Sequence, residues 1–235
     1  YETIVSETVK VSSMETAEST KLMENIFRAV NIAMVNELKL VLDRMGVNIW
    51  EVIDAAKTKP FGFMPFYPGP GMGGHCIPID PFYLSWKAKE FNTEARFIEL
   101  AGEINRKMTE NIAHRVGKAL NDDKKSIHGS KILIVGLAYK KDIDDIRESP
   151  AIKIIDLLNY KGANIDYYDP FVNTFRDLRS IDLLAENIKK YDAVLITTDH
   201  TKTDYDLIGK YASLVIDTRN IMSHVKKPKA RIIMA

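Results

Sequence analysis

The spacing of hydrophobic residues changes halfway along this chain, and that change limits the folds the chain can adopt. From about residue 15 to residue 45, apolar side chains recur every three or four positions, which is typical of one face of an α-helix. Gly46 follows as a stop signal. The same spacing predicts a short helix over 49–57 and a second long helix over 94–120. The residues that mark the first helix are Leu22, Ile26, Ala29, Val30, Ala33, Leu38, Val41, Leu42 and Met45.

Short β-branched runs alternate with helical segments after the polar stretch NDDKKSIHGS. The expected strands are KILIVG (131–136), NIDYYD (164–169), DAVLITT (192–198), LVID (214–217) and ARIIMA (230–235). Ser149 and Pro150 predict the start of the first intervening helix, and Gly162 predicts its end. Such alternation is typical of a doubly wound parallel sheet. We therefore expect an α/β protein with an all-helical domain over 1–121 and a Rossmann-like parallel-sheet domain over 122–235.

Charge and cysteine content exclude several classes of protein. The 33 basic and 32 acidic side chains give a formal charge of +1, so no broad field favours nucleic acid or a membrane surface. The single cysteine excludes an internal disulfide framework and a multi-cysteine metal site. No apolar run approaches the length of a membrane span, and the start has neither an initiator Met nor a signal-peptide pattern. We interpret the chain as a cytoplasmic protein and as a fragment of a longer one.

The only cysteine lies in the loop FYPGPGMGGHCIPIDPFYLSW (66–86), which contains four glycines and four prolines. Glycines let a ligand approach the main chain closely, and prolines stiffen the path around them. Asp80 and Pro81 are predicted as the N-cap and first residue of a helix that runs to Glu90. Cys76 is then expected just before a helix N-terminus, where partial positive charge favours an anion such as a thiolate.

Spacing alone leaves two interpretations of this loop open. Cys76 is either a reactive thiol or a small buried hydrophobe, with Asp80 serving only as a helix cap. A Cys–His hydrolase that uses the neighbouring His75 is disfavoured, because adjacent residues rarely point their side chains at each other. A metal site built from these three residues matches no standard ligand set, so we expect no metal.

Three motifs in one order carry a family resemblance. ESTKLMENIFRAVNIAMVNEL, GPGMGGHCIPIDP and GLAYKKDIDDIRESPA resemble the UDP-glucose/GDP-mannose dehydrogenase family, four-electron oxidoreductases of nucleotide sugars. The resemblance runs from about residue 15 to about residue 220 and implies NAD as the cofactor. The family begins with a Rossmann domain, yet no G-x-G-x-x-G after a strand occurs in this chain. The resemblance therefore implies the central and UDP-sugar-binding domains of such an enzyme.

The resemblance implies a catalytic role for four residues. Cys76 matches the nucleophile, whose attack on an aldehyde gives a thiohemiacetal that is oxidised to a thioester and hydrolysed to the acid. Lys21 and Asn25, which share one helix face, match the lysine and asparagine that stabilise the oxyanion and position water. Asp80 matches a carboxylate that orients or deprotonates the hydrolytic water. Without the resemblance, Lys21 is more simply a solvated surface charge.

The resemblance also implies residues that bind substrate and cofactor. The implied substrate contacts are Phe66, Tyr67, Gly73, Tyr139, Lys140 and Arg219. Arg147 is implied to contact the pyrophosphate of NAD, with pairing to Asp145 or Glu148 as the alternative. Basic side chains suit a diphosphate because charge-assisted hydrogen bonds to phosphate are strong.

The loop motif resembles the branch that oxidises UDP-N-acetylhexosamines, UDP-N-acetylglucosamine in particular, with UDP-N-acetylmannosamine left open and UDP-glucose as the alternative. Some family members carry an arginine before the glycines that reaches the partner's site across a dimer, and here Lys59 is the candidate replacement. The resemblance implies a homodimer built on the first long helix and a role in polysaccharide biosynthesis. A cysteine-dependent hydrolase or acyltransferase and a non-catalytic sugar-nucleotide-binding module remain the other classes.

Overall fold

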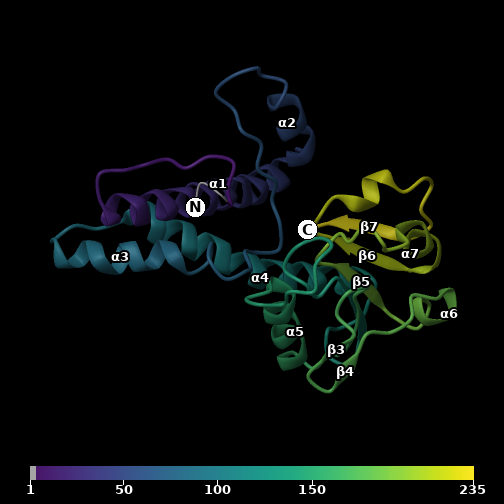
Figure 1. Cartoon of the computed structure of the whole chain (residues 1–235). Coiled ribbons are helices and arrows are strands. Elements are labelled where there is room, and N and C mark those ends of the chain that lie inside the picture. Colours follow the sequence, from purple (N-terminus) through teal and green to yellow (C-terminus); the bar gives the residue numbers. More distant parts are fainter. Residues whose placement is uncertain (1–3) are drawn as a thin grey trace.

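A computed structural model describes residues 4–235, in which long helices precede a five-stranded parallel sheet (Figure 1). The helices of the first half are α1 (Met14–Met45), α2 (Ile49–Ala56), α3 (Asp80–Glu90) and α4 (Arg96–Asp122). The expected fold class, α/β with long helices and a parallel sheet, is confirmed. The first three residues of the predicted helical domain lie outside the described range.

Capping residues set the ends of α1. The Ser13 side chain accepts a hydrogen bond from the Thr16 amide at 3.1 Å, which satisfies one of the free N–H groups of the first turn. At the other end Gly46 adopts a left-handed conformation (φ 72°), and its N–H faces the carbonyls of Leu42 and Asp43. The predicted stop at Gly46 is therefore confirmed.

The buried face of α1 matches only part of its apolar pattern. The residues of α1 that are buried are Asn25, Ala29, Ala33, Val35, Asn36 and Lys39. On the opposite side an apolar stripe stays between 45% and 67% exposed. This exposed stripe consists of Met23, Phe27, Met34, Leu38, Val41 and Met45. Small and polar residues let α1 pack closely against α4. Of the predicted apolar residues, Ala29 and Ala33 are buried, whereas Leu38, Val41 and Met45 are exposed, so the periodicity predicted the helix correctly and its buried side only in part.

The sheet has the strand order β2-β1-β5-β6-β7, and every neighbouring pair is parallel. The elements of the second half are β1 (Lys131–Val135), α5 (Pro150–Tyr160), β2 (Asn164–Tyr168), β3 (Thr174–Phe175), β4 (Leu178–Arg179), α6 (Ala185–Ile188), β5 (Ala193–Ile196), α7 (Tyr205–Tyr211), β6 (Leu214–Asp217), the 3-10 helix η1 (Ile221–His224) and β7 (Arg231–Met234). All five predicted strands are present. The short β3–β4 hairpin, α6 and η1 were not predicted.

Both faces of the sheet are covered, as expected for strands that are nearly continuous apolar runs. Ile132 and Ile134 face a core that includes α5, while Leu133 and Val135 face a core with α6 and α7. The second half of α4, through residues such as Val116, also enters the first of these cores. The helical half and the sheet therefore share a core, and the domain boundary at residue 121 stays a prediction. No helix between residues 4 and 235 is both long enough and apolar enough to cross a membrane.

Candidate active site

The glycine-rich loop between α2 and α3 lies against the edge of the sheet at which its parallel strands end. A Cβ atom at Gly73 would lie 2.6 Å from the Tyr139 Cβ and 2.9 Å from the Glu148 carbonyl. The Gly74 N–H donates to the Arg147 carbonyl at 2.9 Å. Both glycines are thus required for close contact with the segment after β1. Ligands of open α/β sheets bind at this edge.

Buried amides hold the start of the same loop. The Gly69 N–H donates to the Asn36 Oδ1 at 3.0 Å, and the Asn36 Nδ2 donates to the Asn105 Oδ1 at 2.9 Å. A Cβ at Gly69 would lie 2.7 Å from an Arg219 Nη atom. The Arg219 Nε donates to the Thr197 carbonyl at 2.9 Å. Arg219 is therefore fixed between the loop and the sheet.

Cys76 is exposed and lies one turn before α3. Its carbonyl accepts the N–H groups of Asp80 at 2.8 Å and Ile79 at 3.2 Å. The buried-hydrophobe interpretation is wrong for this cysteine. The Cys76 Sγ also lies 3.9 Å from the His75 Nδ1, within the bend that follows Gly74. The expectation that these adjacent side chains face apart is therefore wrong as well.

The predicted N-cap role of Asp80 is wrong. Asp80 is the first residue of α3, Ile79 occupies the cap position, and no side chain caps this helix. The Asp80 carboxylate faces α1 instead, where its Oδ2 accepts a 2.8 Å hydrogen bond from the buried Asn25. Arg28 donates to the Asn25 Oδ1 at 2.8 Å and fixes the orientation of the amide. The structure thus brings together Asn25 and Asp80, which lie 55 positions apart in sequence.

The two lysines among the predicted site residues are exposed. The Lys21 ammonium pairs with Glu24 at 3.3 Å on the surface of α1, one turn before Asn25. Lys140 lies exposed in the segment that follows β1. Neither ammonium is held at the thiol by a hydrogen bond or ion pair of the described residues.

Phe66 and Tyr67 contact the first two helices. The Phe66 ring packs edge-on against Phe27, with centroids 5.6 Å apart. The Tyr67 ring stacks on Trp50 at 5.3 Å, and its hydroxyl donates to Asp54 at 3.1 Å. These contacts place the two residues at the α1–α2 end of the loop.

Arg147 forms the ion pair that the sequence left open. Its guanidinium contacts the Asp145 carboxylate at 2.6 Å and 3.0 Å. These hydrogen bonds raise the pKa of Arg147 above its usual range and hold the pKa of Asp145 below its own. The Arg147 carbonyl accepts the Gly74 N–H, so this ion pair lies in the segment that the loop carrying Cys76 contacts. The predicted contact with a cofactor pyrophosphate stays a prediction.

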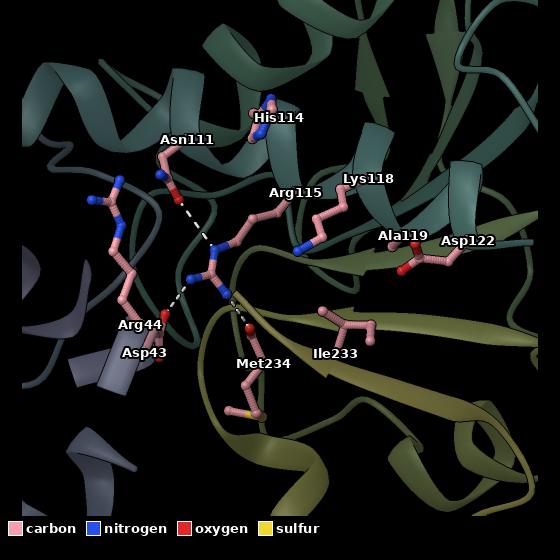
Figure 2. Close-up of a pocket in the computed structure, with 10 residues that line it drawn as sticks. All are labelled: Asp43, Arg44, Asn111, His114, Arg115, Lys118, Ala119, Asp122, Ile233 and Met234. Atoms are coloured by element: carbon pink, nitrogen blue, oxygen red, sulfur yellow. Dashed lines mark hydrogen bonds and ion pairs between the residues drawn. The ribbon is translucent and has the colours of Figure 1, made fainter. Parts of the chain in front are cut away.

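A separate recess of about 580 Å³ lies between the end of α1, α4 and β7 (Figure 2). Arg115 crosses it, donating to the Met234 carbonyl at 2.6 Å and to the Asp43 carboxylate. The buried Lys39 ammonium pairs with the same carboxylate at 2.9 Å, and burial lowers the pKa of Lys39. None of the predicted site residues lines this recess. Between residues 4 and 235, no cluster of three or more His, Cys, Asp or Glu is placed to hold a metal ion.

The buried amides Asn36 and Asn105, which support the loop, were not among the predicted site residues. Asn36 follows Ala29 by seven positions and Ala33 by three, so it continues the buried face of α1. A polar residue at such a position signals a buried hydrogen-bond partner, because buried polar groups are nearly always paired. Asn105 occupies the matching place on α4, where its Nδ2 also donates to the Ala29 carbonyl at 3.3 Å.

The fold defines a class of protein in which a helical unit holds an exposed thiol at the ligand-binding edge of a parallel sheet. Residues 15–107 match the central domain of the UDP-glucose/GDP-mannose dehydrogenase family, and residues 133–224 match the UDP binding domain of the same family. The chain belongs to the UDP-glucose/GDP-mannose dehydrogenase family.

Individual relatives cover almost the whole chain. UDP-N-acetyl-D-mannosamine dehydrogenase of Methanococcus vannielii is 36% identical over 233 residues, which are 95% of this chain and 52% of the relative. NDP-N-acetyl-D-galactosaminuronic acid dehydrogenase of Ralstonia solanacearum is 36% identical over 228 residues, with coverage of 95% and 52%. The solved structure of UDP-D-ManNAc dehydrogenase from Pyrococcus horikoshii superposes with a TM-score of 0.86 at 35% identity, covering 98% of this chain and 54% of that one. The chain therefore spans about half the length of the relatives it matches.

Proposed function

We propose that this chain supplies the catalytic thiol and the UDP-sugar site of an NAD-dependent UDP-N-acetylhexosamine 6-dehydrogenase. The observation that carries the proposal is the position of the exposed Cys76, two residues after Gly74, whose contacts with Tyr139 and with the Arg147 carbonyl hold the loop at the ligand-binding edge of the sheet. The names of several relatives favour UDP-N-acetyl-D-mannosamine over the UDP-N-acetylglucosamine that the loop motif suggested. UDP-glucose stays the alternative substrate.

The proposed chemistry oxidises the C6 alcohol of the sugar to a carboxylate. NAD, when bound, accepts a hydride in each of two steps. In the second step the Cys76 sulfur bonds to the aldehyde carbon, the carbonyl oxygen takes a proton, and the thiol proton passes to a base. We assign the role of this base to His75, whose Nδ1 lies 3.9 Å from the sulfur. Loss of a hydride from the carbon of the thiohemiacetal and of the proton from its hydroxyl group leaves a thioester, and water then releases the acid and regenerates the thiol.

The remaining polar residues suit the hydrolytic step and the two ligands. The Asp80 carboxylate, held by the Asn25 amide, is suited to orient the attacking water. Lys21 lies one turn before Asn25 and suits the oxyanion after it leaves Glu24. The Arg147 side chain is 65% exposed, in the segment that contacts the loop carrying Cys76, which fits a cofactor pyrophosphate.

The proposal predicts that the 235-residue chain alone reduces no NAD yet binds UDP through Lys140 and Arg219. Calorimetry with UDP tests the binding half. Lys140→Ala is the sharper variant, because the side chain is exposed and its loss leaves the fold intact. We expect a loss of affinity of about tenfold or more, as for one charge-assisted hydrogen bond. Lys161→Ala, an exposed lysine at the end of α5, is the matched control. Equal UDP affinity in wild type and Lys140→Ala would remove Lys140 from the site.

A cysteine-dependent hydrolase is the second candidate, because the His75–Cys76 contact is the pair that such chemistry requires. The stoichiometry of the full-length protein separates the two. The dehydrogenase forms two NADH per UDP-sugar, whereas a hydrolase forms none. One NADH per sugar with free aldehyde would contradict the covalent second step.

We also propose that the chain forms a homodimer through the exposed stripe of α1. A continuous apolar stripe on a long helix is costly in water, and a second copy would bury it. The dimeric arrangement that the family resemblance implies supports the same surface.

A further inference from the structure

His200 is fully buried and takes no part in the proposed chemistry, yet both of its ring nitrogens are engaged. The Asp142 backbone N–H lies 3.0 Å from the His200 Nδ1. A backbone N–H can only donate, so Nδ1 must be the unprotonated acceptor. The His200 Nε2–H then donates to the Asp169 Oδ2 at 3.0 Å. The contacts therefore define one neutral tautomer of the ring.

Asp169 connects this histidine to the end of β1. Its Oδ2 also accepts the N–H groups of Leu137 at 2.6 Å and Ala138 at 3.0 Å. Burial works to raise the pKa of Asp169, but hydrogen bonds from His200 and from backbone N–H groups outweigh it and lower the pKa. The ionised carboxylate thus fixes the first residues after β1.

Together these contacts hold both ends of one turn, residues 137–142. The first end is held by Asp169 and by the Thr198 hydroxyl, which donates to the Ala138 carbonyl at 2.6 Å. The second end is Asp142, whose φ of 60° is unfavourable for a residue with a side chain and has to be held by its surroundings. The Thr201 hydroxyl and backbone N–H donate to the Asp142 carboxylate at 2.6 Å and 2.8 Å. The His200 Nδ1 accepts the backbone N–H of Asp142.

Tyr139 and Lys140 lie between these two fixed ends. Tyr139 packs against Gly73 and Gly74 in the glycine-rich loop between α2 and α3, called the thiol loop because it carries Cys76. The shape of the 137–142 turn therefore also sets the contact between the turn and the thiol loop. We infer that His200 is a positioning residue, which accepts the Asp142 N–H and so holds the 137–142 turn in the shape that binds the UDP-sugar. This inference rests on the proposed function for the choice of ligand. The positioning itself rests on the contacts alone.

Two substitutions of His200 distinguish the roles of its two ring nitrogens. An asparagine carbonyl oxygen falls near the place of Nδ1, and a glutamine amide nitrogen falls near the place of Nε2. His200→Asn therefore keeps the acceptor for Asp142 and loses the donor to Asp169. His200→Gln keeps that donor and leaves the Asp142 N–H without its acceptor. His128→Gln, an exposed histidine at the opposite edge of the sheet, is the control.

The test measures UDP affinity by calorimetry on the 235-residue chain, and hydrogen exchange of the Asp142 amide by NMR. We expect His200→Gln to weaken UDP binding about fivefold to tenfold and to speed Asp142 exchange by at least a similar factor. His200→Asn should stay within about twofold of wild type in both measurements. Melting temperatures report the general loss of stability, which both variants share.

Equal UDP affinities in all variants, or equal losses in His200→Asn and His200→Gln, would overturn the inference, because neither pattern depends on the Nδ1 acceptor. If wild type itself binds no UDP, the proposed function fails. In that case the hydrogen exchange of the Asp142 amide still tests whether His200 positions the turn. Unchanged Asp142 exchange in His200→Gln would overturn that positioning role.

Discussion

The two glycines before Cys76, Gly73 and Gly74, contact the segment after β1 so closely that a side chain at either position would overlap it. Gly73 allows the loop that carries Cys76 to touch Tyr139, and the Gly74 N–H donates to the Arg147 carbonyl, so the exposed Cys76 is presented two residues after a fixed contact with the segment that follows β1. A methyl group at Gly73 would overlap the Tyr139 side chain and push the loop away. The chemistry at this scale depends on the loop as much as on the sulfur.

Cys76→Ser should abolish uronate formation by the full-length enzyme and leave UDP affinity within about twofold, since a hydroxyl is a far weaker nucleophile at neutral pH. Product analysis and calorimetry check the two halves of this prediction. Acid formation at the wild-type rate in Cys76→Ser would show that the sulfur takes no covalent part.

Asp169→Asn should lower the free energy of unfolding by about 2–3 kcal/mol at pH 7, because an amide group cannot accept all the N–H groups that the carboxylate accepts. The pKa of Asp169 is lowered from its ordinary value of 3.8. Its contribution is therefore fully present above about pH 3.8 and is lost as the pH falls below that through the folded pKa.

Urea unfolding of wild type and Asp169→Asn between pH 7 and pH 2.5 checks this prediction. The difference between the two proteins should be constant above about pH 5 and should narrow below about pH 3.8. Other carboxylates titrate equally in both proteins and cancel in the difference. A difference that does not change with pH would exclude a linked Asp169.

At the scale of elements, the helix α1 has two faces with different roles. One face carries Asn25, which holds Asp80, and Asn36, which holds the start of the thiol loop. The opposite face carries the exposed stripe. One helix thus supports the candidate site on one side and leaves an apolar surface exposed on the other, where the proposed second copy would bind.

Leu38→Glu should convert the proposed dimer to a monomer of 26.7 kDa, because a charge in the middle of the exposed stripe cannot be buried without a partner. Light scattering at micromolar concentration measures the mass. Lys161→Glu, at the residue that follows α5, is the control with a changed charge outside α1. Ala33→Glu is unsuitable, because Ala33 is only 2% exposed and packs within the protomer. A wild-type mass of 26.7 kDa at every concentration would refute the dimer.

At the scale of the whole molecule, the helical half and the sheet are joined by a shared core and by ion pairs at the recess of Figure 2. Arg115 and Lys39 share the carboxylate of Asp43, and Arg115 also reaches the last strand. This cluster fixes the sheet relative to α1, on which the candidate site depends.

Asp43→Asn should lower the free energy of unfolding by about 3 kcal/mol, because it leaves two cations without their carboxylate. Lys39→Met should change it by less than about 1 kcal/mol, because the protonated lysine is buried at a cost and methionine fills a similar volume. Urea unfolding measures both values. A larger loss in Lys39→Met than in Asp43→Asn would contradict this account of the cluster.

Local pattern was enough to predict much of the molecule. The long helices, the five strands, the stop at Gly46 and the start of α5 at Ser149 depend on spacing and capping within a few residues, and the structure confirms them. The family followed from three motifs. The roles given to the site residues by resemblance stay predictions.

Only the tertiary structure decided which surfaces meet. Apolar spacing marks a helix face but not its partner, and α1 buries the face that holds Asn25 and Asn36 because small and paired polar side chains allow α4 to approach closely. The Asp80 side chain binds Asn25 instead of capping α3, and the Cys76 side chain contacts His75. The directions of both side chains depend on the path that the loop takes across the sheet edge. Sequence determined the elements, since these depend on neighbours along the chain. Packing between distant segments decided the site.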